Sequence, residues 1–166
     1  MEEQKDCLPI YGVGPYYGAF VIISALIGMA LAFFGFLEGG ALSDGLLKKI
    51  FLTIGFLLIL FGIAIWAPAA LGKGCIDKYI KTNTLCTEGV YRFVRNPCYS
   101  GIMIAFTGGL FLMQNLYLLI LPFCYWIGMT VLMKHSEEKW LLKLYGKSYE
   151  DYCRRVNRCI PWFPKK

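Results

Sequence analysis

Charged residues are scarce in this 166-residue sequence and are missing altogether from three long stretches. Asp, Glu, Lys and Arg make up 17% of the chain, against about 25% in a typical soluble domain. None of them occurs in the segments 7–37, 50–72 and 96–133. A helix rises about 1.5 Å per residue, so the second segment alone is long enough to cross a hydrocarbon core about 30 Å thick. This distribution argues against a soluble domain and predicts a polytopic integral membrane protein.

Other familiar signals are also missing. The seven cysteines include no C-x-x-C pair, so we expect reduced thiols and neither a disulfide framework nor a metal site. The start, MEEQKDCLPIYG, is acidic and has no adjacent cleavage site of the small-residue type, so we expect no signal peptide. There is no internal repeat, low-complexity tract or linker. We therefore expect a single membrane domain over residues 1–166.

The third uncharged stretch is too long for one span, and a polar pair divides it. Gln114-Asn115 has the composition of a turn, which predicts a tight helical hairpin. The resulting fold class is all-α, with about four transmembrane helices at 16–37, 50–70, 97–113 and 116–135. Pro122 falls inside the last span and is expected to kink it. Whether a fifth span or a re-entrant segment exists stays open.

The basic residues lie mostly on one side of this topology. Fifteen of the 17 Lys and Arg residues fall in the N-terminal segment, the segment 73–95 or the tail after residue 133, and only Lys48 and Lys49 lie opposite. The positive-inside rule therefore places both termini in the cytoplasm. The net charge of +6 has the same origin, so we expect membrane lipids and no nucleic acid as partners.

Polar residues gather in two segments, 81–101 and 134–161, both on the predicted cytoplasmic side. In the first, Asn96-Pro97 is a favoured helix start, and its free N–H groups would suit a carboxylate or another anion. Arginine and tyrosine side chains surround it. A plain interfacial belt of Tyr and Arg is the alternative interpretation. Further along, Gly101, Ala105 and Gly109 form a ladder of small residues that should let another helix pack closely.

The second segment begins with an acidic pair, Glu137-Glu138, where the last span ends. The pair is either a solvated helix end or a site that holds a cation. Gly146 should end one helix, and the run 148–151 has the form of a capping box that starts another. Tyr149, Tyr152 and Val156 would then share one face, and we expect three arginines to reach toward lipid phosphates: Arg154, Arg155 and Arg158. Together the two segments suit a zwitterionic, aromatic ligand, of which S-adenosylmethionine is one.

These two segments resemble the signature of the integral membrane methyltransferases of the isoprenylcysteine carboxyl methyltransferase type, with phospholipid methyltransferases as relatives. The matching stretches cover about the last 85 residues; they are Thr87–Tyr91, Arg95–Gly101, Glu137–Leu141, Tyr145–Tyr152 and Ile160-Pro161. The resemblance implies that 81–101 and 134–161 form a cytoplasmic pocket for S-adenosylmethionine. Its cofactor-binding positions would be Asn83, Thr84, Leu85, Cys86, Tyr91, Arg95, Asn96, Pro97, Cys98, Tyr99, Glu137 and Glu138, with Glu137 as the partner of the cofactor's ammonium.

The acceptor implied by the resemblance is lipid-like or prenylated, with a carboxylate of the isoprenylcysteine type favoured. Two positions depart from the pattern: Asn96 stands where eukaryotic members commonly have His, and Met133 where they have an arginine thought to hold the substrate carboxylate. Lys134 is the candidate replacement for that arginine, with Arg155 as a second candidate for the substrate. His135 is the only imidazole, so Lys134 and His135 are the catalytic candidates.

Other functions stay open from the sequence. The same scaffold would serve a methyltransferase that acts on the nitrogen of a phospholipid or on the nitrogen or sulfur of another small molecule. A membrane reductase of the sterol type would bind NADPH instead, and a non-enzymatic membrane subunit would bind neither cofactor. The nature of the bound nucleotide separates these classes.

Overall fold

The computed structural model describes residues 13–71 and 84–165, which form helices and, apart from two isolated β-bridges, no strands. The predicted all-α fold is therefore confirmed for the described ranges. In chain order the elements are α1 (Gly14–Phe33), the 3-10 helix η1 (Glu38–Gly40), α2 (Gly45–Leu71), the 3-10 helix η2 (Gly89–Arg92), α4 (Pro97–Leu112), the 3-10 helix η3 (Leu116–Leu119), α5 (Ile120–His135), α6 (Glu137–Tyr145) and α7 (Lys147–Arg155).

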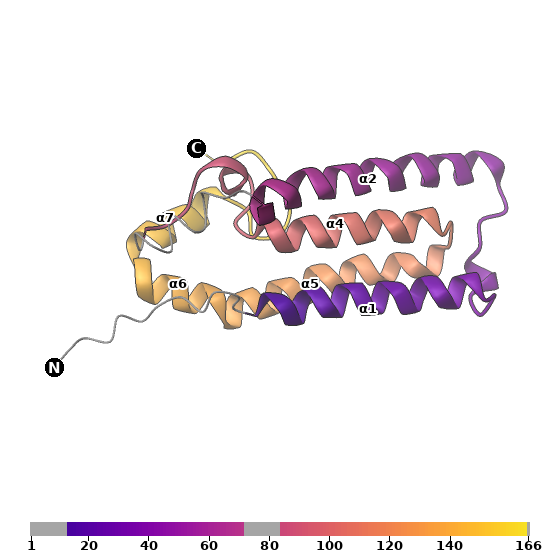
Figure 1. Ribbon diagram of the computed structural model, residues 1–166, viewed down its shortest axis with the longest axis horizontal. Helices are drawn as coiled ribbons and strands as arrows, with labels where there is room; N and C mark the ends of the chain where they lie inside the picture. The colour runs from indigo at the N-terminus through magenta and orange to yellow at the C-terminus, as the bar shows by residue number, and fades with distance from the viewer. Residues whose placement is uncertain (1–12, 72–83, 166) are drawn as a thin grey trace.

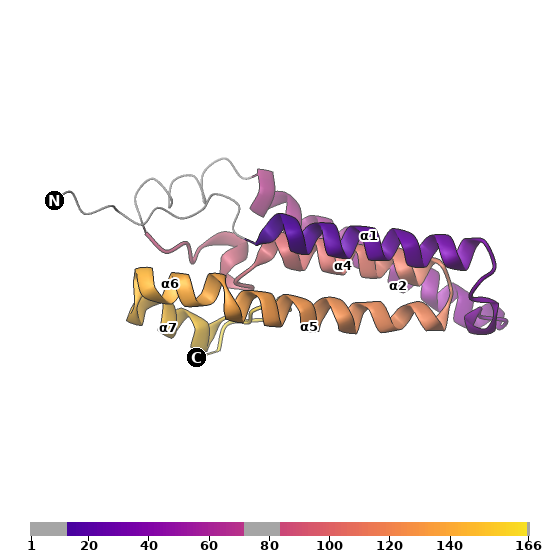
Figure 2. The same cartoon turned by 90° about the horizontal axis from the view of Figure 1, so that it is seen from below.

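The long helices α1, α2, α4 and α5 run side by side, and α6 and α7 extend beyond one end of this bundle (Figures 1 and 2). Within residues 13–71 and 84–165, three helical stretches are long and apolar enough to cross a membrane: α1, α2 and the continuous stretch Leu116–Tyr145. The predicted third span, α4, is apolar but has only 16 residues, or about 24 Å of helix. Most large apolar side chains on the outer faces of α1 and α2 are exposed, as expected for helices that face lipid.

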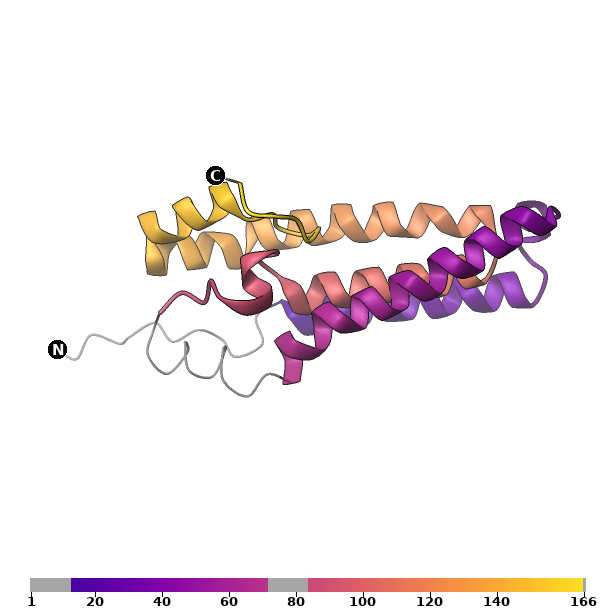
Figure 3. The same cartoon turned by 90° about the horizontal axis from the view of Figure 1, so that it is seen from above.

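Helix α2 crosses α4 in a close contact that glycines make possible (Figure 3). A Cβ on Gly62 of α2 would lie 2.5 Å from the backbone nitrogen of Ala105, and one on Gly101 would lie 2.8 Å from the carbonyl of Gly62. Gly108 makes the same kind of approach to Gly55. The predicted small-residue ladder is thus confirmed at Gly101 and Ala105. Its third member is Gly108 instead of Gly109, whose nearest neighbour is Met29 of α1.

The hairpin between α4 and α5 turns at Gln114 and Asn115, as the sequence predicts. Gln114 has a positive φ of 53°, and the buried Asn115 side chain joins this turn to the connection between α1 and α2. Its Oδ1 accepts the N–H of Tyr117 at 3.0 Å, and its Nδ2 donates to the carbonyl of Leu37 at 2.7 Å. The prediction that Pro122 kinks the last span is wrong, because α5 begins only at Ile120. Pro122 therefore lies in the first turn of α5, where a helix N–H needs no partner.

The core of the bundle lies between α1, α4 and α5. Its fully buried members include Tyr17, Val21, Tyr125, Met129 and Met133. The Tyr17 hydroxyl donates to the carbonyl of Tyr125 at 3.1 Å, which satisfies that buried donor. This core holds the start of α1 against the end of α5, and so sets where α6 begins.

Gly146 separates the two C-terminal helices. It has a positive φ of 53° and follows α6 directly, as predicted from its place in the sequence. The predicted capping box is wrong, because α7 starts at Lys147 and makes no side-chain cap. The backbone of Gly146 itself makes the turn, so Ser148 lies within the first turn of the helix.

Candidate functional site

The two polar segments predicted from the sequence lie against each other at the end of the bundle. Val94 and Asn157 form a parallel bridge, and the N–H of Arg95 donates to the carbonyl of Asn157 at 2.9 Å. Farther out, the N–H of Trp162 donates to the carbonyl of Phe93 at 3.0 Å. The chain before α4 is therefore clamped along the chain after α7.

Glu137, the first residue of α6, lies where α1, α4 and α6 meet. Its Oε1 accepts two hydrogen bonds, from the N–H of Val13 at 3.1 Å and from the hydroxyl of Tyr99 at 3.1 Å. Burial raises the pKa of the Glu137 carboxyl, and the two hydrogen bonds oppose that shift because they stabilise the ionised form. A half-buried carboxylate held in this way is suited to bind a cation such as an ammonium group.

Glu138 points into a different environment and joins an ion cluster with two arginines. Arg158 contacts it with two nitrogens, Nε at 2.6 Å and Nη2 at 2.8 Å, and Nη1 of Arg95 lies 2.9 Å from its Oε1. The side chains of Arg95 and Glu138 are only 8% and 15% exposed. Arg95 also donates to the Cys153 sulfur. The expectation that Arg158 reaches toward lipid phosphates is therefore wrong, and Arg95 and Glu138 hold the two segments together.

Tyrosine side chains also stabilise the contact between the two polar segments. Tyr149, Tyr152 and Val156 are buried together, as the spacing predicts, and Leu85 packs against them. The Tyr152 hydroxyl donates to the carbonyl of Tyr91 at 2.6 Å. Within the predicted cofactor segment, the carbonyl of Thr84 accepts from the Tyr145 hydroxyl at 3.4 Å. Asn83 lies outside the described residues.

Helix α4 begins at Pro97, as predicted, but Asn96 does not cap it. The Asn96 side chain makes no cap hydrogen bond and instead donates from Nδ2 to the carbonyl of Arg158 at 3.1 Å. Pro97 is buried and Cys98 is half-buried. The first helical hydrogen bond of α4 runs from the N–H of Ser100 to the carbonyl of Asn96 at 3.0 Å. Pro97 has no N–H, so the N–H groups of Cys98 and Tyr99 form the expected positive helix end, and the Tyr99 side chain joins this end to Glu137.

The candidates for the acceptor side, Lys134, His135 and Arg155, are all exposed. Nδ1 of His135 lies 2.9 Å from the carbonyl of Val131 within the same helix. Met133, at the position of the expected arginine, is fully buried in the core. Adjacent helix residues point about 100° apart, so Lys134 does not occupy the place that Met133 takes. Arg155 is exposed, and its Nε lies 3.4 Å from the carbonyl of Asp151.

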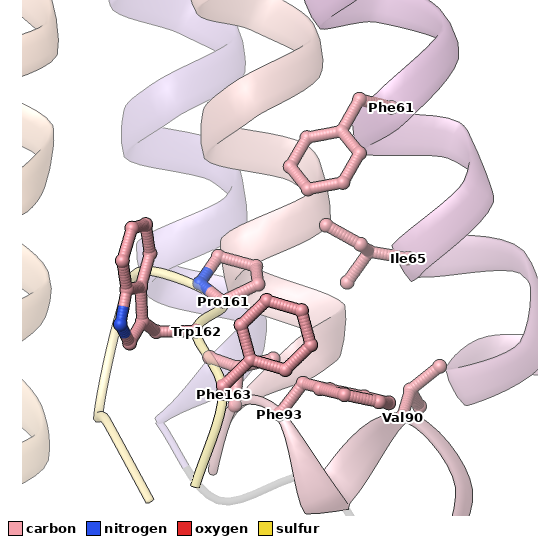
Figure 4. A pocket seen from close by; sticks show the side chains of 8 residues that line it. Phe61, Ile65, Val90, Phe93, Pro161, Trp162 and Phe163 are labelled. Carbon is pink, nitrogen blue, oxygen red and sulfur yellow. The ribbon is translucent and has the colours of Figure 1, made fainter. Parts of the chain in front are cut away.

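Two apolar cavities open beside the clamped segments. One, of about 350 Å³, lies between α2, η2 and the tail (Figure 4); it is lined by Phe61, Ile65, Val90, Phe93, Val94, Pro161, Trp162 and Phe163. The other, of about 440 Å³, lies between α2, α4, α5 and the tail. Phe61 and Pro161 line both. The cavities are therefore neighbours, and their linings suit an aliphatic or isoprenoid group rather than a polar one.

The expectation of reduced thiols is confirmed for Cys98, Cys124, Cys153 and Cys159, which are free. It is wrong for Cys86, which is disulfide-bonded. The absence of a C-x-x-C pair excludes only a short-range pairing, because a disulfide joins residues that are close in space whatever their separation in sequence.

The sequence did not predict two of the contacts that hold the acidic pair Glu137-Glu138 in place. Val13 binds Glu137 through its backbone N–H, which every residue except proline has, so no residue type marks it. The pairing of Arg158 with Glu138 joins residues 20 apart. A charged pair at such spacing becomes visible only when the turn at Gly146 folds the chain back.

Comparisons with known proteins match a family model and several relatives. The family model described as phospholipid methyltransferase matches residues 49–148. The protein-S-isoprenylcysteine O-methyltransferase of Schizosaccharomyces pombe is 27% identical over 129 residues, covering 64% of this chain and 54% of that protein. A methanethiol S-methyltransferase of Bradyrhizobium diazoefficiens is 30% identical over 105 residues, covering 62% and 33%.

A probable protein-S-isoprenylcysteine O-methyltransferase of Oryza sativa subsp. indica is 26% identical over 116 residues, covering 66% of this chain and 60% of that protein. The chain thus spans between a third and three fifths of the length of these relatives. No solved structure matches it.

Proposed function

Because this chain belongs to the phospholipid methyltransferase family, we propose that it is an integral membrane enzyme that transfers a methyl group from S-adenosylmethionine to a lipid-like or prenylated acceptor. The observation that carries the proposal is the Glu137 carboxylate. It is half-buried at the meeting point of α1, α4 and α6 and is held by Val13 and Tyr99. It belongs to the acidic pair that the family resemblance assigns to the cofactor's ammonium.

The residues present fit this cofactor. Glu137 would hold its ammonium, and the N–H groups of Cys98 and Tyr99 in the first turn of α4 would receive its carboxylate, since Pro97 has no N–H. Of the other cofactor candidates, Leu85 and Tyr91 lie on the described chain before α4. The sulfonium of the cofactor supplies an already activated methyl group. The protein's task is then to hold the acceptor in line with that group and to exclude water from the site. A carboxylate acceptor needs no general base for this reaction.

The acceptor's apolar part would lie in the two cavities that share Phe61 and Pro161. Their volumes and linings favour an isoprenoid or acyl chain over a small polar substrate. The names of the relatives point first to an isoprenylcysteine carboxylate. The family description suggests a phospholipid amine, and one relative's name suggests a small thiol. These two acceptors are the alternatives.

The proposed topology has four spans, α1, α2, α4 and α5, with both termini in the cytoplasm. It rests on the positive-inside rule: 15 of the 17 basic residues fall on one side. The cofactor would then enter from the cytoplasm at the end of the bundle that carries α6 and α7, while the acceptor enters from the bilayer.

The test is isothermal titration of the detergent-purified protein with S-adenosylhomocysteine, with NADPH as the competing nucleotide. We expect saturable binding of S-adenosylhomocysteine alone. Glu137→Gln should weaken it by about 1.5–3 kcal/mol, the value of a hydrogen bond to a charged group. The matched control is Glu150→Gln on the exposed face of α7, which should bind normally. Binding of NADPH, or equal affinity in both variants, would contradict the proposal.

A further inference from the structure

We infer that the start of α1 is a positioning element of the cofactor site, which fixes the Glu137 carboxylate through Val13 and through the Tyr99 ring seated on Gly14. The inference rests on the proposed function, since it assigns a role to residues around the proposed ammonium-binding carboxylate. It concerns Val13 and Gly14, which lie outside the matched segment 49–148.

The first step is the backbone of α1. Val13 is the residue that precedes the helix, and its N–H donates to Oε1 of Glu137 at 3.1 Å. The N-terminal end of a helix carries a partial positive charge, so it attracts a carboxylate. The start of α1 thereby orients Glu137, although 124 residues separate them.

The second step is the Tyr99 ring. Its hydroxyl donates to the same oxygen at 3.1 Å. The ring packs on Gly14, where a Cβ would lie 2.6 Å from the ring carbon Cε1, closer than real Cβ atoms approach. The edge of the ring also meets Tyr17, with ring centroids 6.0 Å apart. Glycine at position 14 is thus what lets the ring lie against the start of α1.

Val13 and Tyr99 donate to the same carboxylate oxygen of Glu137. With Oε1 held by Val13 and Tyr99, Oε2 is the oxygen left, among the described residues, to accept from an ammonium group. The carboxylate is therefore preorganised, and a ligand does not have to order it on binding. Displacing the Tyr99 ring should cost affinity without removing any group that touches the ligand's ammonium.

The experiment compares two glycines of α1, one turn apart, by titration with S-adenosylhomocysteine. Gly14→Ala should raise the Kd roughly 3- to 10-fold, the equivalent of one ordinary hydrogen bond. Gly18→Ala is the matched control, because a Cβ there would only touch Ile102 at 4.0 Å. Introduced into Glu137→Gln, Gly14→Ala should add nothing, whereas a general loss of folding would lower binding in either background.

A second variant separates positioning from packing. Tyr99→Phe keeps the ring but removes the hydroxyl, and with it one of the hydrogen bonds that lower the pKa of Glu137. The pKa should therefore rise further, and binding should be lost at a higher pH as the pH falls. Among the residues that the structure describes, the ionisable side chains facing Glu137 are Tyr99 and Tyr91, with Glu138 beside it, and tyrosines stay neutral across the range from pH 5 to 8.

The titrations distinguish a failure of this inference from a failure of the proposed function. A loss specific to Gly14→Ala, with an upward shift of the pH profile in Tyr99→Phe, supports the inference. Equal affinity of the Gly14→Ala and Gly18→Ala proteins, or an unshifted profile, overturns it while leaving the proposed function in place. If the unmodified protein does not bind S-adenosylhomocysteine at all, the proposed function fails and this inference fails with it.

Discussion

Neighbouring glutamates at the start of α6 have different surroundings. Glu137 faces α1 and α4 and is held by two neutral donors. Within the described ranges no cationic side chain pairs with it, so its carboxylate is suited to a cationic ligand. Glu138 faces the tail and is neutralised by Arg95 and Arg158. Consecutive helix residues point about 100° apart, so one position belongs to the candidate site and the next to the scaffold around it.

At this scale we predict that Glu138→Ala destabilises the protein. It would leave Arg95, whose side chain is only 8% exposed, without its carboxylate, and breaking a buried ion pair from one side costs about 3–5 kcal/mol. Thermal unfolding in detergent should show a clear drop in the midpoint. The control is Glu150→Ala, which removes the exposed pair with Arg154 and should cost about 0.5 kcal/mol or less. Equal midpoints would contradict a structural role for the Glu138 cluster.

Helices α2 and α4 come close enough at four glycines for their backbones to be in contact. In a membrane the lipid is as apolar as the side chains, so helix association depends on close packing and not on the removal of apolar surface from water. Gly55 and Gly62 of α2 face Gly108 and Gly101 of α4 at distances that exclude a Cβ. The contact places α2 where it lines both apolar cavities.

At the scale of the element we predict that Gly62→Ala separates α2 from α4. The new Cβ would lie 2.5 Å from the backbone nitrogen of Ala105, and backbone cannot move aside as the end of a side chain can. Overpacking of this kind costs about 1–3 kcal/mol, measurable as a lower thermal midpoint. Gly45→Ala, at the start of the same helix with no atom within 4 Å of its Cβ, should leave the midpoint unchanged or raise it. A harmless Gly62→Ala would mean that the two helices are less closely packed.

The two ends of the helix bundle carry different elements. The bundle carries α6, α7, the clamped segments and the ion cluster at the same end, where the described C-terminus also lies (Figure 1). Of the described residues, the opposite end carries the connection between α1 and α2 and the turn at Gln114. Under the proposed function, cofactor and acceptor would have separate routes, the first from water at the end with α6 and α7 and the second from the bilayer through the apolar cavities.

At the scale of the molecule we predict the orientation. Lys165→Cys and Lys49→Cys place exposed thiols at opposite ends of the bundle. In intact cells a membrane-impermeant maleimide should label Lys49→Cys, whereas Lys165→Cys should react only after the membrane is opened. The unmodified chain provides the background from the native cysteines. The reverse pattern would put the proposed cofactor site outside the cytoplasm. Labelling of both variants in intact cells would put both ends of the bundle on the same side of the membrane and would contradict the proposed even number of spans.

Much of the fold was predictable from local features of the chain. The uncharged stretches indicated the long helices, Gln114-Asn115 the hairpin, Pro97 the start of α4 and Gly146 the end of α6. Each of these signals acts over a few residues, through hydropathy or through the allowed backbone angles. The predictions that failed, such as the capping role of Asn96 and the kink at Pro122, depended on which of several competing partners or boundaries the folded chain adopts.

The sequence by itself determined that this is an apolar helical protein with two polar segments, and the acidic pair and its motif partners marked where a site would form. Only the tertiary structure decided how that site is divided. In the folded chain Glu138 pairs with Arg95 and Arg158, whereas Glu137 accepts hydrogen bonds from Val13 and Tyr99. Met133 is buried and its neighbour Lys134 is exposed. The physical reason is that hydrogen bonds and ion pairs depend on distances between atoms far apart in the chain, and the packing of α1, α4 and α6 sets those distances.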